Sequence, residues 1–253
     1  MKPIFILSVL GAKEWIRLKF FHLVIFVALL FIVFSHLLSS LTFSVQERLL
    51  FDFGLAGLEI GLVFISSLIG SHAIHREIER KTLFVLLARP IPRWNIVLGS
   101  WGALIILNII FAVGFSFSFM TTAGFWTLFQ GFLIAASSSV LKALVISSFA
   151  LAMGLLVRPI LALGTGVCYW VLCYSLPDVQ FFVGKLKNEG LSNFVAFLDK
   201  IIPQFYRFNW KSYYYVMNSP SGSDILWMVT HCLAWTFVWL FFGSLFFQRK
   251  EIA

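Results

Sequence analysis

Apolar and polar positions follow each other along this chain in long blocks rather than in short alternation. Six of the blocks are mostly apolar and 17 residues or longer. A helix of about 20 such residues, rising about 1.5 Å per residue, crosses the roughly 30 Å hydrocarbon core of a bilayer. The pattern therefore predicts an all-α integral membrane protein, a single transmembrane domain over 1–253 with six transmembrane helices. The expected spans are 20–41, 53–74, 96–119, 140–157, 160–176 and 225–247.

Composition agrees with this interpretation. The chain is 60% hydrophobic and 12% charged, whereas a soluble domain carries about 25% charged residues. Three cysteines, Cys168, Cys173 and Cys232, lie in apolar runs without a C-x-x-C or His–Cys spacing. We therefore interpret them as small core residues and expect no metal site.

The segment 1–19 precedes the first span and carries both apolar and charged residues. It begins like a signal peptide, but Lys13, Glu14 and Arg17 follow the short apolar run 4–10 where a small-residue cleavage site would stand. Its apolar residues recur at helical spacing opposite these charges. We expect an interfacial helix on the cytoplasmic leaflet. The apolar positions are Phe5, Val9, Ala12, Trp15 and Ile16.

Two further segments do not follow the span pattern. The uncharged stretch 120–139 is long for a turn, so we expect a bent or partly re-entrant segment, or an outward extension of the fourth span. The segment 177–224 is polar, with an amphipathic helix near 191–202 that Pro203 ends, followed by clustered aromatic residues. We expect this outer loop to lie on the outer membrane surface and cap the spans. A stacking platform for carbohydrate or nucleic acid is the alternative.

Basic residues fix the expected orientation. The N-terminal segment, the loop 75–95, Arg158 and the C-terminus together hold 12 of the 19 Lys and Arg residues. Six spans would place all of these on one side, so the positive-inside rule predicts that both termini are cytoplasmic. The same rule explains the net charge of +8, and we expect no nucleic-acid partner.

We single out three polar residues inside the expected spans, Glu59, Lys142 and Asn108. Ionisable groups are costly there and are paired or functional. Glu59 lies 17 residues from Arg76, and Lys142 lies 16 residues from Arg158. Both therefore stand about 24–26 Å above the inner face. Either they pair, or each extends separately to the outer interface. Asn108 in the third span is expected to form an interhelical hydrogen bond.

The loop 75–95 separates the second and third spans and is the most informative stretch of the sequence. It carries five Lys or Arg residues against two Glu, around an apolar centre at 82–87 that is too short to span a bilayer. Pro90 and Pro92 then end any helix. This pattern predicts a short amphipathic helix at the membrane face, closed by a rigid turn, that contacts a soluble partner. The alternative is a basic loop that only sets orientation.

This loop resembles the intracellular loop of ABC-2-type permeases, the membrane subunits of ABC transporters of the type V exporter group. The similarity is strongest to the branch with permeases for nitrous-oxide-reductase maturation and gliding motility. In that branch a Gly-Lys pair often follows the motif, where this chain has Gly99-Ser100, so no role is transferred for that lysine. The motif reads Glu77-x-Glu79-Arg80-Lys81-Thr82, then Leu86-Leu87-Ala88-Arg89-Pro90-Ile91-x-Arg93-Trp94-x-Ile96-x-Leu98-Gly99.

The resemblance implies an elbow helix over 1–19, a coupling helix in 75–95 and separate cytoplasmic ATPase subunits that bind ATP and magnesium. It also implies a second permease copy or homologue, forming a dimer in membrane lipid, and export as the usual direction. The outer loop would act as a lid. The residues expected to contact the ATPase are Glu77, Arg80, Lys81, Leu83, Leu86, Leu87, Arg89, Pro90 and Arg93.

No catalytic motif is present in the sequence. There is no G-x-x-x-x-G-K-[ST] loop, since Leu186 follows Gly184-Lys185, and no H-E-x-x-H or G-x-S-x-G motif. We expect no catalytic residue, no metal and no directly bound cofactor, so energy comes from a partner subunit or an ion gradient.

The sequence thus predicts a permease subunit of an ATP-driven ABC exporter in the bacterial plasma (inner) membrane. Its rivals are a non-transporting membrane scaffold or assembly subunit, and a gradient-driven carrier. An internal repeat would favour the carrier, and none is visible. The sequence does not identify the substrate.

Overall fold

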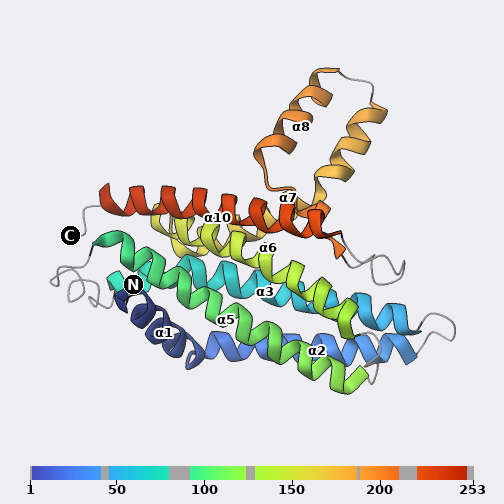
Figure 1. Ribbon diagram of the computed structural model, residues 1–253, viewed down its shortest axis with the longest axis horizontal. Helices are drawn as coiled ribbons and strands as arrows, with labels where there is room; N and C mark the ends of the chain where they lie inside the picture. Colours follow the sequence, from blue (N-terminus) through green and yellow to red (C-terminus); the bar gives the residue numbers. More distant parts are fainter. Residues whose placement is uncertain are drawn as a thin grey trace.

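The computed structural model describes residues 2–40, 46–79, 92–123, 129–186, 189–210 and 221–249, and all regular structure in these ranges is helical (Figure 1). Long apolar runs without internal breakers favour helices in a membrane because each helix satisfies its own backbone hydrogen bonds. The elements are α1 (Lys2–Ile16), α2 (Lys19–Ser40), α3 (Gln46–Glu79), α5 (Arg93–Ala123), α6 (Phe129–Leu156), α7 (Pro159–Lys185), α8 (Glu189–Ile201), the 3₁₀ helix η2 (Phe205–Phe208) and α10 (Gly222–Arg249).

Six of these helices are long and apolar enough to cross a membrane: α2, α3, α5, α6, α7 and α10. They form one bundle, and both chain termini lie at the same end of it (Figure 1). The prediction of an all-α membrane protein with six membrane-spanning helices is confirmed. We call the end that holds the termini the terminal end, and the opposite end the distal end.

Helices α3 and α6 form the centre of the bundle. In their apolar stretches 72% of the residues are buried, whereas only 22% are buried in those of α7 and α10. At the distal end the core is aromatic, with ring centroids 5.7 Å apart for Phe51 and Phe119 and 5.3 Å apart for Phe119 and Phe132. Aromatic pairs in this range add to the stabilisation from burial alone. The central helices are thus enclosed by protein, while α7 and α10 present apolar surface outwards.

Toward the terminal end, small residues let the central helices approach closely. A Cβ atom added at Gly154 of α6 would lie 2.5 Å from the carbonyl oxygen of Ser71 on α3. One added at Gly70 of α3 would lie 3.0 Å from the Cβ atom of Ala150 on α6. Small residues at such contacts replace side-chain packing by backbone packing.

The structure corrects two expected boundaries. The fourth span begins at Phe129, so residues 129–139 of the stretch 120–139 are an extension of that span. Residues 124–128 lie outside the described residues. Helix α7 does not end near Leu176 but continues through Pro177 to Lys185. Proline removes one backbone donor and kinks a helix without having to end it, and the apolar residues Val179, Phe181 and Phe182 continue the helical run.

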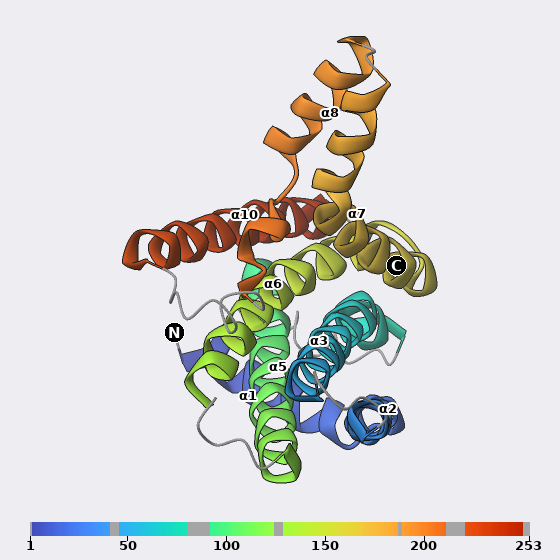
Figure 2. The ribbon, with the colours of Figure 1, turned by 90° about the vertical axis from the view of Figure 1, so that its right-hand side faces the viewer.

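The last part of α7 and α8 form a hairpin that projects sideways from the bundle (Figures 1 and 2). The amphipathic helix expected near 191–202 is present as α8. The expectation that this segment caps the ends of the spans is wrong for the hairpin, because it extends away from the bundle. Only the chain after α8 returns to the bundle, and there Phe205, Phe208 and Trp210 are buried.

Candidate functional site

A buried ion pair joins the two central helices. Lys142 Nζ on α6 donates a hydrogen bond to Glu59 Oε1 on α3 at 2.6 Å, with 1% and 3% of the two side chains exposed. The pairing alternative is therefore the observed one. Two opposite charges removed from solvent are tolerated when they neutralise each other at close range. The sequence placed both residues at equal helical depth and left pairing as one of two alternatives.

A third helix also contacts this pair. Trp170 Nε1 on α7 donates to the same Glu59 oxygen at 3.3 Å, and Lys142 Nζ lies 5.7 Å from the ring centroid of Tyr174. The Tyr174 hydroxyl in turn accepts a hydrogen bond of 2.6 Å from Asn209 Nδ2, just after η2. The chain that returns from the hairpin is thus connected to the ion pair through α7.

Asn108 forms the interhelical hydrogen bond expected of it. Its Nδ2 atom donates to Ser66 Oγ at 3.0 Å, and Ser66 Oγ lies 3.1 Å from the carbonyl oxygen of Ala143, to which it can donate. All three residues are buried. This second polar contact joins α5, α3 and α6, so the central helices carry two polar connections along their length.

Arg93, the first residue of α5, contacts the end of α10. Its Nη1 atom donates to the carbonyl oxygens of Phe247 and Gln248 at 3.2 and 3.3 Å. The last carbonyls of a helix lack partners within the helix, so a cation there satisfies them and complements the helix dipole. Sequence reasoning expected Arg93 to face an ATPase and missed this contact, because nothing local links residues more than 150 positions apart.

Arg76, near the end of α3, contacts the N-terminal helix. Its Nη2 atom lies 3.2 Å from Glu14 Oε1, and its guanidinium carbon lies 5.0 Å from the Trp15 ring centroid. Glu77, the next residue, is partly buried. Beyond the charge of each residue, no pattern in the sequence indicated this contact. The other expected ATPase contacts lie outside the described residues: Arg80, Lys81, Leu83, Leu86, Leu87, Arg89 and Pro90.

The aromatic residues of the returning chain form packing rather than an open platform. Phe205, Phe208 and Trp210 cluster with Met228 and Cys232 of α10. A stacking surface for carbohydrate or nucleic acid needs open ring faces, so the described rings do not support that alternative. Tyr213, Tyr214 and Tyr215 lie outside the described residues.

A polar contact closes the base of the hairpin. The Tyr206 hydroxyl donates to Asp199 Oδ1 at 3.0 Å, and Gln204 Nε2 lies 3.2 Å from Asp199 Oδ2. Partial burial raises the pKa of Tyr206 above its ordinary value, so the phenol keeps its proton at neutral pH. The end of α8 is therefore held to the chain that returns to the bundle.

These features define a multi-pass membrane protein in which several charged residues join one helix to another. The described ranges hold no cluster of three or more His, Cys, Asp or Glu that could bind a metal ion. Residues 57–252, more than half of the chain, match the family described as ABC-2 family transporter protein. The chain belongs to this family, whose members are membrane components of ABC transporters and work with ABC ATPase subunits. A comparison with curated protein sequences gave no match.

Proposed function

We propose that this chain is the membrane-spanning permease subunit of an ATP-driven ABC exporter in the bacterial inner membrane, with both termini in the cytoplasm. Separate ATPase subunits bind ATP and magnesium and dock on the loop between α3 and α5. Family membership and the basic, amphipathic character of this loop support the proposal. The chain itself supplies no catalytic residue and holds no cofactor.

The observation that carries this proposal is the way the two flanks of the loop are anchored. On one flank Arg76 joins α3 to α1 through Glu14, and on the other Arg93 joins α5 to the last carbonyls of α10. A movement imposed on the loop by nucleotide-driven closure of an ATPase would therefore reach four helices at once. A loop that only set orientation would need neither anchor.

The buried ion pair is the far end of this connection. Helix α3 runs without interruption from Glu79 back to Glu59, so displacement of its terminal end is transmitted along a rigid element. At Glu59 the displacement meets α6 through Lys142 and α7 through Trp170. We infer that these contacts couple loop movement to α7 and to the hairpin.

A second permease copy, identical or homologous, covers part of the exposed apolar surface of α7. Six helices enclose no pathway by themselves, and Val171 and Leu172 of α7 are 48% and 55% exposed. Cysteine crosslinking at Leu172 in native membranes tests this arrangement. A crosslinked dimer is expected. If Leu172→Cys gives no crosslink while a cysteine on another helix does, the interface lies on that other helix and not on α7.

The test of the proposed function is copurification of an ATPase with the tagged chain from native membranes. We expect an ATP-hydrolysing partner with the wild-type chain, and its loss with Arg80→Glu/Arg89→Glu. Lys185→Glu, at the hairpin, is the matched control and should keep the partner. Arg93 is left unchanged because it stabilises the end of α10. Failure of any ATPase to copurify under mild detergent would support a non-transporting scaffold instead.

A further inference from the structure

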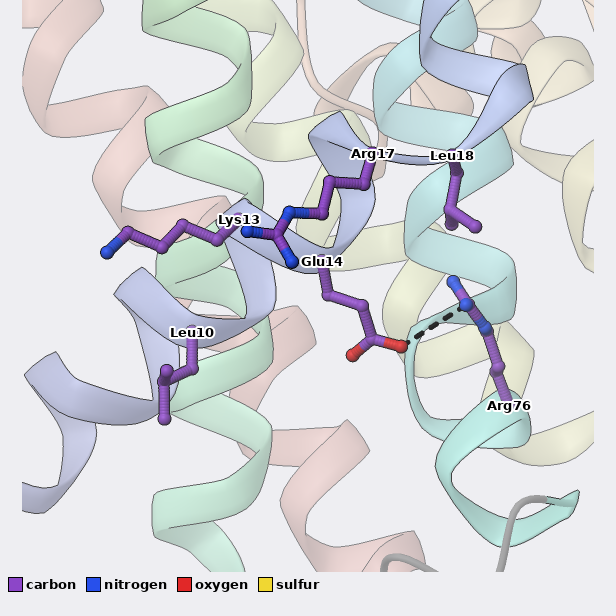
Figure 3. A pocket seen from close by; sticks show the side chains of 6 residues that line it. All are labelled: Leu10, Lys13, Glu14, Arg17, Leu18 and Arg76. Carbon is purple, nitrogen blue, oxygen red and sulfur yellow. Dashed lines mark ion pairs between the residues drawn. The ribbon is translucent and has the colours of Figure 1, made fainter.

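A basic groove lies where α1 passes the terminal end of α3 (Figure 3). Its volume is about 380 Å³. The proposed docking of an ATPase does not use it, and it lies apart from the Glu59–Lys142 pair. It is lined by Leu10, Lys13, Glu14, Arg17, Leu18 and Arg76.

The groove carries more positive than negative charge. Three cationic side chains line it against one carboxylate, that of Glu14, which is already held by Arg76 at 3.2 Å. In the described part of the chain, neither Lys13 nor Arg17 forms an ion pair.

The cations approach from two helices. In Figure 3 the Arg17 side chain extends back along α1 toward Glu14, Lys13 extends outward from α1, and Arg76 reaches over from α3. Arg76 Nη1 is buried and has no hydrogen-bond partner among the residues that the structure describes. A guanidinium with unused donor capacity next to two exposed cations suits an anion with several acceptor oxygens.

The rim of the groove is apolar. Leu10 is 58% exposed, and Phe5 and Ile6, one to two turns earlier on α1, are 69% and 54% exposed. Apolar side chains of this size are exposed at low cost where acyl chains cover them. An anion that fits here therefore carries its own hydrophobic part, which distinguishes a lipid headgroup from a free anion.

We propose that this groove binds the phosphate group of an anionic phospholipid. Arg17 and Arg76 contact the phosphate oxygens, the flexible Lys13 ammonium adds a third contact, and Leu10 and Leu18 pack against the glycerol and upper acyl region. Bound lipid would hold α1 against the end of α3, next to the Glu14–Arg76 ion pair. The position of α1 would thereby depend on the charge of the surrounding leaflet.

The test uses the purified full-length chain and the change in its melting temperature on addition of lipid. Phosphatidylglycerol should stabilise the wild-type chain, whereas phosphatidylcholine at the same concentration should not. The variant Lys13→Gln/Arg17→Gln should need about 25-fold more phosphatidylglycerol for the same rise in melting temperature. Each basic residue near an anionic lipid surface contributes about a fivefold factor in affinity. Arg249→Gln, a charge removed from α10, is the matched control and should behave as wild type.

The outcomes separate the possible ligands. Equal stabilisation of the wild-type chain and the double variant by phosphatidylglycerol would overturn the site. Equal stabilisation by the two lipids would overturn the headgroup selectivity. Stabilisation by inorganic phosphate to the same extent as by phosphatidylglycerol would show that the groove takes a free anion and would overturn the lipid proposal. Native mass spectrometry of the same samples gives a second readout that does not depend on unfolding.

Discussion

The contact between α3 and α6 and the hairpin of α7 and α8 are built in opposite ways. The α3–α6 contact is buried, contains a charged pair, and uses Gly70 and Gly154 to bring backbones together. The hairpin exposes large apolar side chains, among them Phe182 at 64% and Phe197 at 58%. One region has its partners within the chain, and the other presents its apolar surface outwards.

This difference assigns separate roles to the two regions. A contact built from a charge pair and backbone packing has one good arrangement, so it resists small displacements and transmits them. A two-helix projection with one buried position on α8, Val195, is stabilised by few internal contacts. Changes in the α3–α6 contact should therefore alter the whole bundle, and changes in the hairpin should remain local.

The largest expected effect comes from breaking the ion pair on one side. Lys142→Met leaves the Glu59 carboxylate buried without its cation, which should reduce the free energy of unfolding by about 3–5 kcal/mol. Unfolding of the purified chain in mixed micelles, followed by helical circular dichroism, measures this change.

The double variant Glu59→Leu/Lys142→Met distinguishes charge from packing. Replacing both members by apolar residues removes the uncompensated charge, so most of the lost stability should return. A single variant as stable as wild type would mean that water reaches the pair, and the proposed contrast with the hairpin would then lose its main support.

Glycine substitutions test the same contrast with one methyl group. Gly154→Ala places a Cβ atom 2.5 Å from the Ser71 carbonyl oxygen, so α3 and α6 must separate. We expect a loss of about 1–3 kcal/mol in the free energy of unfolding. Gly184→Ala in the hairpin meets nothing within 4 Å. It should be neutral or stabilise α7 by up to about 1 kcal/mol, because alanine favours the helix.

A loss from Gly184→Ala as large as that from Gly154→Ala would show that the hairpin packs against something as tightly as the central helices do. The same micelle unfolding assay measures both variants, and alanine at the open position Gly164 of α7 serves as a third comparison. Equal effects at all three positions would point to a general response of the helices rather than to the close approach at Gly154.

Sequence reasoning succeeded where a signal is carried by the chain's own periodicity. Apolar run length predicted the spanning helices, and equal distance from a basic end brought Glu59 and Lys142 to one depth. It placed the end of the fifth span at 176, whereas the apolar residues beyond Pro177 continue the helix to Lys185. It also missed the role of Arg93, since a helix cap supplied from another helix depends on the packing of α5 beside α10. Contacts of this kind arise only from the three-dimensional arrangement.

The smallest effects are expected within the hairpin itself. Val195→Ala removes two methyl groups from a buried position, so it should destabilise α8 by about 1–2 kcal/mol. Backbone amides of α8 should then exchange about tenfold faster, because 1.4 kcal/mol corresponds to a factor of 10, while exchange in α3 and α6 stays unchanged. Phe197→Ser, on the exposed side of α8, should alter exchange less than twofold in detergent. Faster exchange in α3 after Val195→Ala would show instead that the hairpin and the central helices unfold as one unit, and the two regions would then differ in composition but not in stability.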